Sequence, residues 1–158
     1  MRRIGITGGI GSGKSVVSRL LRIMGYSVYD TDSEAKRLME SSLEVVQKLS
    51  ECFGRDIYHN GRLNRGLLSS RVFGKSDKIV LLNSIVHPVV RFDFYRWSES
   101  LNEEICFVES AILYESRFDE LVDEVWTVTA PEELRIGRVR ERSGLTEEEI
   151  KKRMAAQL

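Results

Sequence analysis

The 158-residue sequence has few cysteines, few prolines and no excess of either charge. Its two cysteines, Cys52 and Cys106, lie far apart and lack the spacing of metal ligands, which argues against a disulfide framework and a zinc site. Lys and Arg number 24, as do Asp and Glu, so no net positive field favours nucleic acid or an anionic membrane. With 2 prolines and 42% hydrophobic residues, the composition is that of a folded globular chain.

The amino terminus holds no long apolar segment. Met1 and two arginines are followed by only a few apolar residues before Thr7, which is too short for a signal peptide core or a membrane span. We therefore expect a cytoplasmic protein with neither nucleic acid nor a membrane as partner. The length predicts a single domain, and the sequence leaves its oligomeric state open.

Apolar patterning predicts an α/β chain. Residues 3–7 read as a short buried strand, the apolar positions of 14–24 recur at helical spacing, and Gly25 ends that helix. Residues 26–30 then alternate as a second strand. Strand, loop, helix and strand in succession make one βαβ unit with a right-handed crossover, so we expect a parallel sheet.

A long insertion separates the second strand from the third, which is predicted at 105–109 and is followed by a fourth at 124–129. Because one crossover helix needs far fewer residues, we interpret the stretch from about 33 to 104 as an inserted helical lobe. Its predicted helices cover about 32–50, 64–73, 76–87 and 88–103, with Pro88 breaking or kinking the last pair.

The last part of the chain is predicted to be helical. Pro131 and the acidic residues after it open one helix, and Thr146 with Glu149 forms a capping box for the final one. That helix reaches Leu158 without a stop signal, so we expect a truncated chain.

The motif with the most specific chemistry lies between the first strand and the first helix. Residues 8–15, GGIGSGKS, fit the phosphate-loop pattern G-x-x-x-x-G-K-[ST] in its required context. Glycines let the backbone curl around a polyphosphate with its N–H groups inward, while Lys14 reaches the β- and γ-phosphates and Ser15 ligates Mg²⁺. The predicted nucleotide-binding residues are Gly9, Ile10, Gly11, Ser12, Gly13, Lys14, Ser15 and Val16. The alternative is a glycine-rich turn that only joins a strand to a helix.

A carboxylate follows the second strand. Asp32 sits where a parallel sheet delivers its carboxyl ends, next to the expected phosphate loop, and ligands bind at such ends. It is therefore a candidate base for an acceptor hydroxyl that attacks the γ-phosphate. Alternatively, Asp32 or Ser33 is the N-cap of the next helix, and the residues alone favour neither interpretation over the other.

Six segments together resemble dephospho-CoA kinase over essentially the whole chain. They are ITGGIGSGKS, VYDTDSEAKRL, GRLNRGLLSSRVF, NSIVHPVV, ESAILYES and APEELRIGRVRERSGLTEEEIKKRMAAQ. The resemblance implies a three-layer α/β/α P-loop kinase with a parallel sheet and an inserted helical acceptor-binding lobe. It also implies transfer of the ATP γ-phosphate, with Mg²⁺, to the ribose 3′-hydroxyl of dephospho-CoA, the last step of coenzyme A synthesis.

The resemblance also assigns roles on the acceptor side. Asp32 matches the second aspartate of the family's DxD, the proposed base, and Arg65 matches the arginine of its LxR motif, where the acceptor binds. His87 matches the family's His-Pro pair, which we expect to orient substrate or to serve the structure, since a histidine beside proline is more often a hydrogen bonder at a helix junction.

Two arginines belong to the region that resembles the family's lid, about residues 135–150. Arg138 and Arg142 lie four apart on one helix face, from which two guanidinium groups can clamp the transferring phosphoryl oxygens. The alternative for this charge-rich stretch is a solvated face. Similarity to the lid favours the catalytic role, more firmly for Arg142.

The chain departs from the family pattern at several points. Val16 stands where many members have Thr, and Glu109 replaces an Asp that is followed two residues later by proline, which leaves the role of Glu109 open. Members continue past the position of Gln157 with a strand and a helix that are absent here. Two other functions compete with this assignment: another small-molecule or nucleoside kinase, and a nucleotide-binding regulatory module without catalysis. Retention of Lys14, Ser15 and Asp32 argues against the second.

Overall fold

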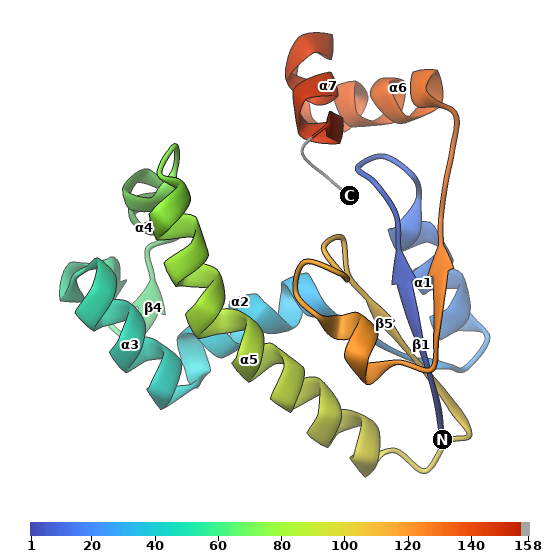
Figure 1. Ribbon diagram of the computed structural model, residues 1–158, viewed down its shortest axis with the longest axis horizontal. Coiled ribbons are helices and arrows are strands. Elements are labelled where there is room, and N and C mark those ends of the chain that lie inside the picture. Colours follow the sequence, from blue (N-terminus) through green and yellow to red (C-terminus); the bar gives the residue numbers. More distant parts are fainter. Residues whose placement is uncertain (156–158) are drawn as a thin grey trace. The chain divides into compact units, whose positions relative to one another are not determined.

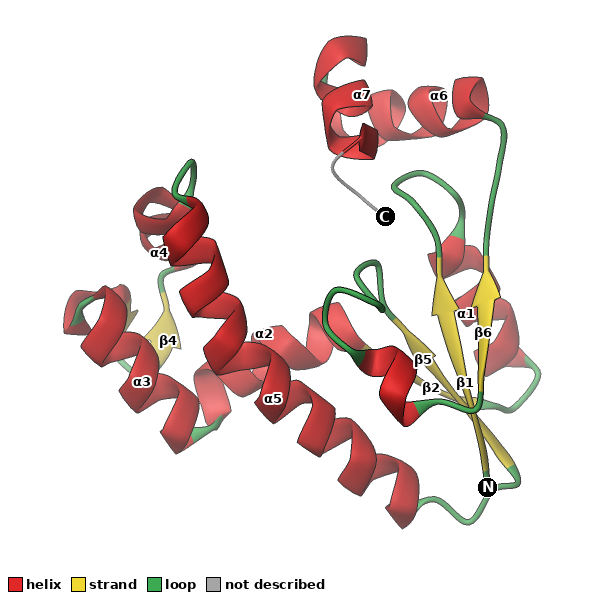
Figure 2. Cartoon of the chain, viewed as in Figure 1, coloured by secondary structure: helices red, strands yellow, loops and turns green. Residues whose placement is uncertain are grey.

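Four parallel strands form the central sheet of the computed structural model, which describes residues 1–155 (Figure 2). Their order is β2-β5-β1-β6, and every neighbouring pair is parallel, so the predicted parallel sheet is confirmed. The strands are β1 (Arg2–Thr7), β2 (Ser27–Asp30), β5 (Ile105–Glu109) and β6 (Glu124–Thr127).

Helix α1 (Lys14–Ile23) covers one face of this sheet, as expected of a βαβ unit (Figure 1). Ile4 and Ile6 of β1 point to that face because side chains alternate along a strand, and they pack with Leu21 of α1. Between them, Gly5 faces the opposite side, where an added Cβ would meet Leu113 at 2.6 Å. The core is therefore assembled around β1, the strand that leads into the phosphate loop.

The chain divides into two compact units. The first comprises residues 1–30 and the chain from Ser98 onward, and the second comprises Thr31–Trp97. The second unit contains helices, one 3-10 helix and a two-stranded hairpin: α2 (Thr31–Ser41), α3 (Leu43–Phe53), η1 (Arg55–Ile57), β3 (Tyr58–His59), β4 (Arg62–Leu63), α4 (Arg65–Val72) and most of α5 (Ser76–Ser100).

One predicted helix of the second unit is wrong in extent, and one element of that unit was not predicted. The helix expected over 32–50 is two helices, because Ser42 starts α3 as its N-cap and its hydroxyl accepts from the Val45 N–H. The hairpin β3–β4 was not predicted at all. Asn60 and Gly61 form its two-residue turn with positive φ values of 48° and 76°, as such hairpin turns require.

Pro88 does not break the helix it occupies. Helix α5 continues from Ser76 to Ser100 through this proline, where two helices were predicted. Proline removes one backbone donor, which leaves the carbonyl four residues earlier without its helical partner. Because Ser84, which carries that carbonyl, is exposed, water can satisfy it, while the buried Val86, Val90 and Phe94 hold the helix to the core of its unit.

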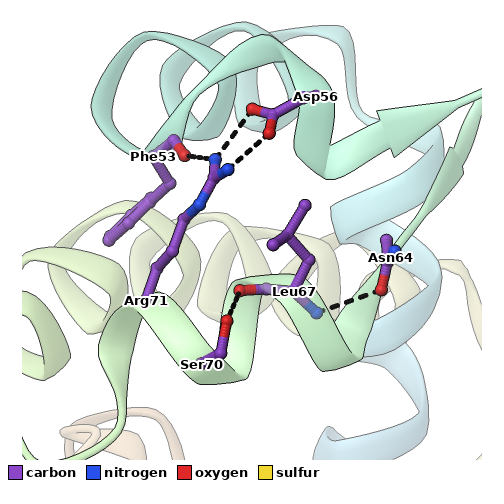
Figure 3. Close-up of polar contacts among 6 residues, drawn as sticks. All are labelled: Phe53, Asp56, Asn64, Leu67, Ser70 and Arg71. Carbon is purple, nitrogen blue, oxygen red and sulfur yellow. Dashed lines mark hydrogen bonds and ion pairs between the residues drawn. The ribbon is translucent and has the colours of Figure 1, made fainter.

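The joint between α3 and α4 depends on one arginine (Figure 3). Arg71 of α4 donates to the Phe53 carbonyl at the end of α3 and forms a two-pronged ion pair with Asp56. The pKa of Asp56 is lowered by its hydrogen bond to this guanidinium. At the other end of α4, the Asn64 side chain caps the helix by accepting from the Leu67 N–H at 3.0 Å.

The chain continues after β5 through a short 3-10 helix, η2 (Phe118–Leu121), and ends in α6 (Glu132–Ser143) and α7 (Glu147–Ala155). The predicted capping box is confirmed, since the Thr146 N–H donates to Glu149 at 2.8 Å and Thr146 Oγ1 accepts from the Glu149 N–H at 3.3 Å. The final three residues of the helix predicted to reach Leu158 lie outside the described residues. None of the helices described over 1–155 has the length and hydropathy needed to cross a membrane.

Candidate active site

The predicted phosphate loop lies between the centre of the sheet and the start of α1. Strand β1 is bonded to β5 on one side and β6 on the other, so its end at Thr7 is held firmly. Helix α1 begins at Lys14. Its N-cap residue is Gly13, which has a left-handed backbone conformation and makes no side-chain hydrogen bond to the helix. A helix start without a capping side chain offers backbone N–H groups and a positive dipole end to an anion.

Two side chains in the loop are suited to phosphate. Lys14 Nζ turns back onto the loop, donating to the Gly8 carbonyl and, at 3.3 Å, to that of Gly9. Ser12 is 4% exposed, and within residues 1–155 its hydroxyl has no hydrogen-bond partner. A buried polar group without a partner is costly, and a phosphate oxygen would satisfy it. The loop therefore fits a polyphosphate.

Ser15 and Glu109 meet at the carboxyl ends of the central strands. Glu109 is the last residue of β5, and Ser15 lies in the first turn of α1, with Oγ 3.3 Å from Glu109 Oε1. Both groups are hard oxygen ligands of the kind Mg²⁺ takes. Over residues 1–155 no group of three His, Cys, Asp or Glu side chains could hold a metal. The pair suits an ion that takes its remaining ligands from phosphate and water. The side chain of the neighbouring Val16 is exposed.

The arginines predicted on one helix face have different surroundings. Arg138 Nη1 donates to the carbonyls of Gly11 and Ser12 at 3.3 and 3.4 Å, so α6 lies against the phosphate loop. Arg142 is exposed and, within residues 1–155, makes no hydrogen bond or ion pair. Sequence reasoning missed Arg135, whose Nε donates to the Ile10 carbonyl at 3.0 Å. Its spacing of three residues before Arg138 was the available signal.

Asp32 lies in the first turn of α2, because that helix begins at Thr31, directly after β2. The alternative interpretation of Asp32 or Ser33 as N-cap is therefore wrong, since the cap precedes the first helical residue. Asp32 is exposed, and as an acid in the first turn it favours the helix dipole.

The remaining predicted substrate-binding residues also belong to the second unit. Arg65, the first residue of α4, forms an exposed ion pair with Glu40 at 3.4 Å. The hydroxyl of Tyr58 donates to the Met39 carbonyl. The pKa of Tyr58 is raised to about 12, mainly by burial and to a lesser extent by the negative charge of Glu40.

His87 is half-buried in the middle of α5. Burial, and then the nearby positive charge of Arg91, lower its pKa. The imidazole is therefore biased to the neutral form.

Comparisons with known proteins assign the chain to a family. The family model described as dephospho-CoA kinase matches residues 2–158. The chain belongs to the dephospho-CoA kinase family. The dephospho-CoA kinase of Porphyromonas gingivalis is 46% identical over 157 residues, which cover 99% of this chain and 78% of that protein. That of Corynebacterium diphtheriae is 40% identical over 162 residues, covering 100% of this chain and 81% of its relative.

Solved structures agree with the fold. A Thermus thermophilus protein superposes with a TM-score of 0.83 at 38% identity, covering 99% of this chain and 80% of that one. A dephospho-CoA kinase from Campylobacter jejuni has a TM-score of 0.71 at 23% identity, covering 99% and 81%, and so supports the fold alone. The expected α/β kinase fold, with a parallel sheet and flanking helices, is confirmed.

Proposed function

We propose that this chain is a dephospho-CoA kinase that transfers the γ-phosphoryl group of ATP to the ribose 3′-hydroxyl of dephospho-CoA, giving ADP and coenzyme A. The observation that carries this proposal is the family match over residues 2–158, which includes a phosphate loop with the geometry described above. ATP is the phosphate donor of the family. The reaction forms a bond from the hydroxyl oxygen to the γ-phosphorus and breaks the bond to the ADP oxygen.

The phosphate loop would hold the donor. The loop's backbone N–H groups, apart from those of Ser12 and Val16, which donate to the carbonyls of Gly9 and Gly13, and the ammonium of Lys14 would neutralise the phosphate oxygens, and the buried Ser12 hydroxyl would gain the acceptor it lacks. Because phosphoryl transfer needs little covalent help from the protein, positioning and charge neutralisation account for most of the catalysis.

Ser15 and Glu109 would hold Mg²⁺. Held by these two side chains, Mg²⁺ would supply positive charge that offsets the charge developing on the leaving group. The 3.3 Å contact between Ser15 Oγ and Glu109 Oε1 supports this pairing, although Glu109 is one methylene longer than the aspartate usual in the family.

Asp32 would accept the proton of the 3′-hydroxyl as that oxygen attacks. Two observations support this role: the family's DxD motif matches here, and the side chain is exposed. Arg65 and His87 would bind or orient the acceptor. Arg65 can exchange its exposed partner Glu40 for a substrate anion at little cost, since such surface pairs contribute about 0–1 kcal/mol.

Arg138 and Arg142 would neutralise the transferring phosphoryl group. The bonds of Arg138 to loop carbonyls are long, at 3.3 and 3.4 Å, so a charge-assisted bond to phosphate is the better alternative for this guanidinium. Arg142 is exposed on the same helix and projects from the same face.

A coupled assay of ADP release tests the function. Purified protein with Mg²⁺ and ATP should release ADP rapidly when dephospho-CoA is added and only slowly without it. A regulatory nucleotide-binding module would bind ATP and show no such stimulation. Equal ADP release in both reactions would show that the chain is not this kinase.

A further inference from the structure

The helix pair α6–α7 contacts the phosphate loop through successive carbonyl groups. Arg135 donates to the carbonyl of Ile10 at 3.0 Å, and Arg138 donates to those of Gly11 and Ser12. The two arginines are three residues apart, so they project from one face of α6. In Figure 1 the helix pair lies beside the loop that follows β1, as these bonds require.

These bonds determine which way the loop's amide groups point. Each peptide bond here is trans, so the N–H of a peptide group points opposite to its carbonyl. When Arg135 binds the Ile10 carbonyl, the N–H of Gly11 is directed away from α6. The bond of Arg138 to Ser12 does the same for the N–H of Gly13. An anion-binding loop needs its N–H groups turned to one side, and Arg135, whose 3.0 Å bond is the shorter one, holds the Ile10 carbonyl on the other even when Arg138 turns to phosphate.

Glycines 9 and 11 allow the helix to come this close. A Cβ on Gly9 would lie 2.2 Å from the Arg135 guanidinium, and a Cβ on Gly11 would lie 2.6 Å from the Arg135 carbonyl oxygen. The second clash is with helix backbone, so no rotation of a side chain relieves it. Gly11 is therefore needed for the contact with α6 as well as for curvature around phosphate, whereas a Cβ on Gly9 would displace only the end of the Arg135 side chain.

The side chain of Ile10 provides the apolar half of the contact. Ile136, Val139 and Ile150 form a buried cluster between α6 and α7, and Ile10 packs against it. The tip of the phosphate loop thus inserts into the core of the helix pair. A phosphate loop uses its backbone at this position, which leaves the isoleucine side chain without a role in nucleotide binding.

We propose that Arg135 and Ile10 form a docking contact through which α6–α7 fixes the phosphate-loop backbone, which makes Arg135 a positioning residue for ATP binding. Arg135 acts through the loop and does not contact substrate. It is partly buried with its Nε committed to Ile10, whereas Arg138 and Arg142 are exposed. The inference rests on the proposed function, because it concerns how the donor nucleotide is held.

The test compares Arg135→Gln with Arg140→Gln, an exposed arginine of the same helix. We measure the Kd for ATP by calorimetry, the KM for each substrate, and Tm. Loss of a hydrogen bond from a charged donor should weaken ATP binding about tenfold or more in Arg135→Gln, with KM for dephospho-CoA unchanged and Tm lowered slightly, because the bond also stabilises the fold. Arg140→Gln should match the wild type. Equal ATP affinity in the two variants would overturn the proposal, as would a loss confined to kcat.

A second pair of variants, at Ile10, tests the same contact from the side of the phosphate loop. Ile10→Ala should weaken ATP binding in the same way, while Ile10→Val, which keeps most of the apolar contact, should restore it. The double variant Ile10→Ala/Arg135→Gln should lose less affinity than the product of the two single losses, because both act through one contact. Fully multiplicative losses would contradict a shared contact.

These outcomes are separate from those for the proposed function. If the wild type binds ATP but does not phosphorylate dephospho-CoA, the function is wrong and the affinities still decide the role of Arg135. If the wild type is active and the Arg135 variants bind ATP normally, only the positioning role fails.

Discussion

Replacement of Asp32 by asparagine separates a catalytic carboxylate from a structural one. Asparagine keeps the size and polarity of the side chain but cannot take a proton. A general base typically contributes about 10²–10⁴-fold to the rate, which corresponds to roughly 2.7–5.5 kcal/mol in the barrier. If Asp32 serves only the dipole of α2, its loss should cost about 0.3–1 kcal/mol of stability and leave turnover intact. A catalytic role therefore predicts a large loss in kcat, whereas a structural role predicts a small loss in unfolding free energy with kcat unchanged.

The structure provides a matched control for this substitution. Glu34 is a second acid in the first turn of α2, so Glu34→Gln removes the same charge from the same helix end. We expect Asp32→Asn to bind ATP normally, to keep its Tm within a few degrees and to lose at least a hundredfold in kcat at saturating substrates. Glu34→Gln should retain kcat. A loss below tenfold in Asp32→Asn, with chemistry shown to be rate-limiting, would refute the catalytic role.

Three further predictions concern the cap of α4, the phosphate loop and pH. Asn64→Ala should lower the unfolding free energy by about 0.5–2 kcal/mol and Asn64→Asp should not, as measured by urea denaturation. Gly11→Ala should weaken ATP binding, measured by calorimetry, far more than Gly144→Ala does. Both glycines have positive φ, but of the two only Gly11 would bring a Cβ against backbone, 2.6 Å from the Arg135 carbonyl oxygen. Equal ATP affinities in the two variants would contradict this packing. The folded pKa of His87 is lowered, so its contribution to stability is complete above the unfolded value of about 6.5 and is lost as pH falls through the folded pKa. Urea denaturation at pH 7.5 and 5.5 should show a smaller loss on acidification in His87→Gln than in the wild type, and parallel losses would disprove the linkage.

The first βαβ unit could be predicted because several independent signals agree. Residues 3–7 read as a short buried strand, the motif at 8–15 demands a strand before it and a helix after it, and Gly25 ends that helix. The capping box at Thr146 was likewise predictable, because its bonds join residues only three apart in sequence. Local interactions of this kind leave a direct trace in the sequence.

The errors have physical causes as well. Strands β3 and β4 are two residues each, too short for any periodicity, and the Asn60-Gly61 pair was their one signal. Pro88 carries a strong helix-breaking tendency that the buried face of α5 overrides. Arg135 went unnoticed because its partner, the Ile10 carbonyl, is 125 residues away and backbone acceptors are not visible in a sequence pattern.

The most direct measurement of the central claim is the acceptor specificity of the purified protein. With Mg²⁺ and ATP present, kcat/KM is measured for dephospho-CoA, AMP, adenosine and shikimate, and each product is identified by mass spectrometry. The account predicts far faster phosphorylation of dephospho-CoA than of the others, with coenzyme A as the product. A comparable rate with AMP, or ADP release without a phosphorylated acceptor, would contradict it.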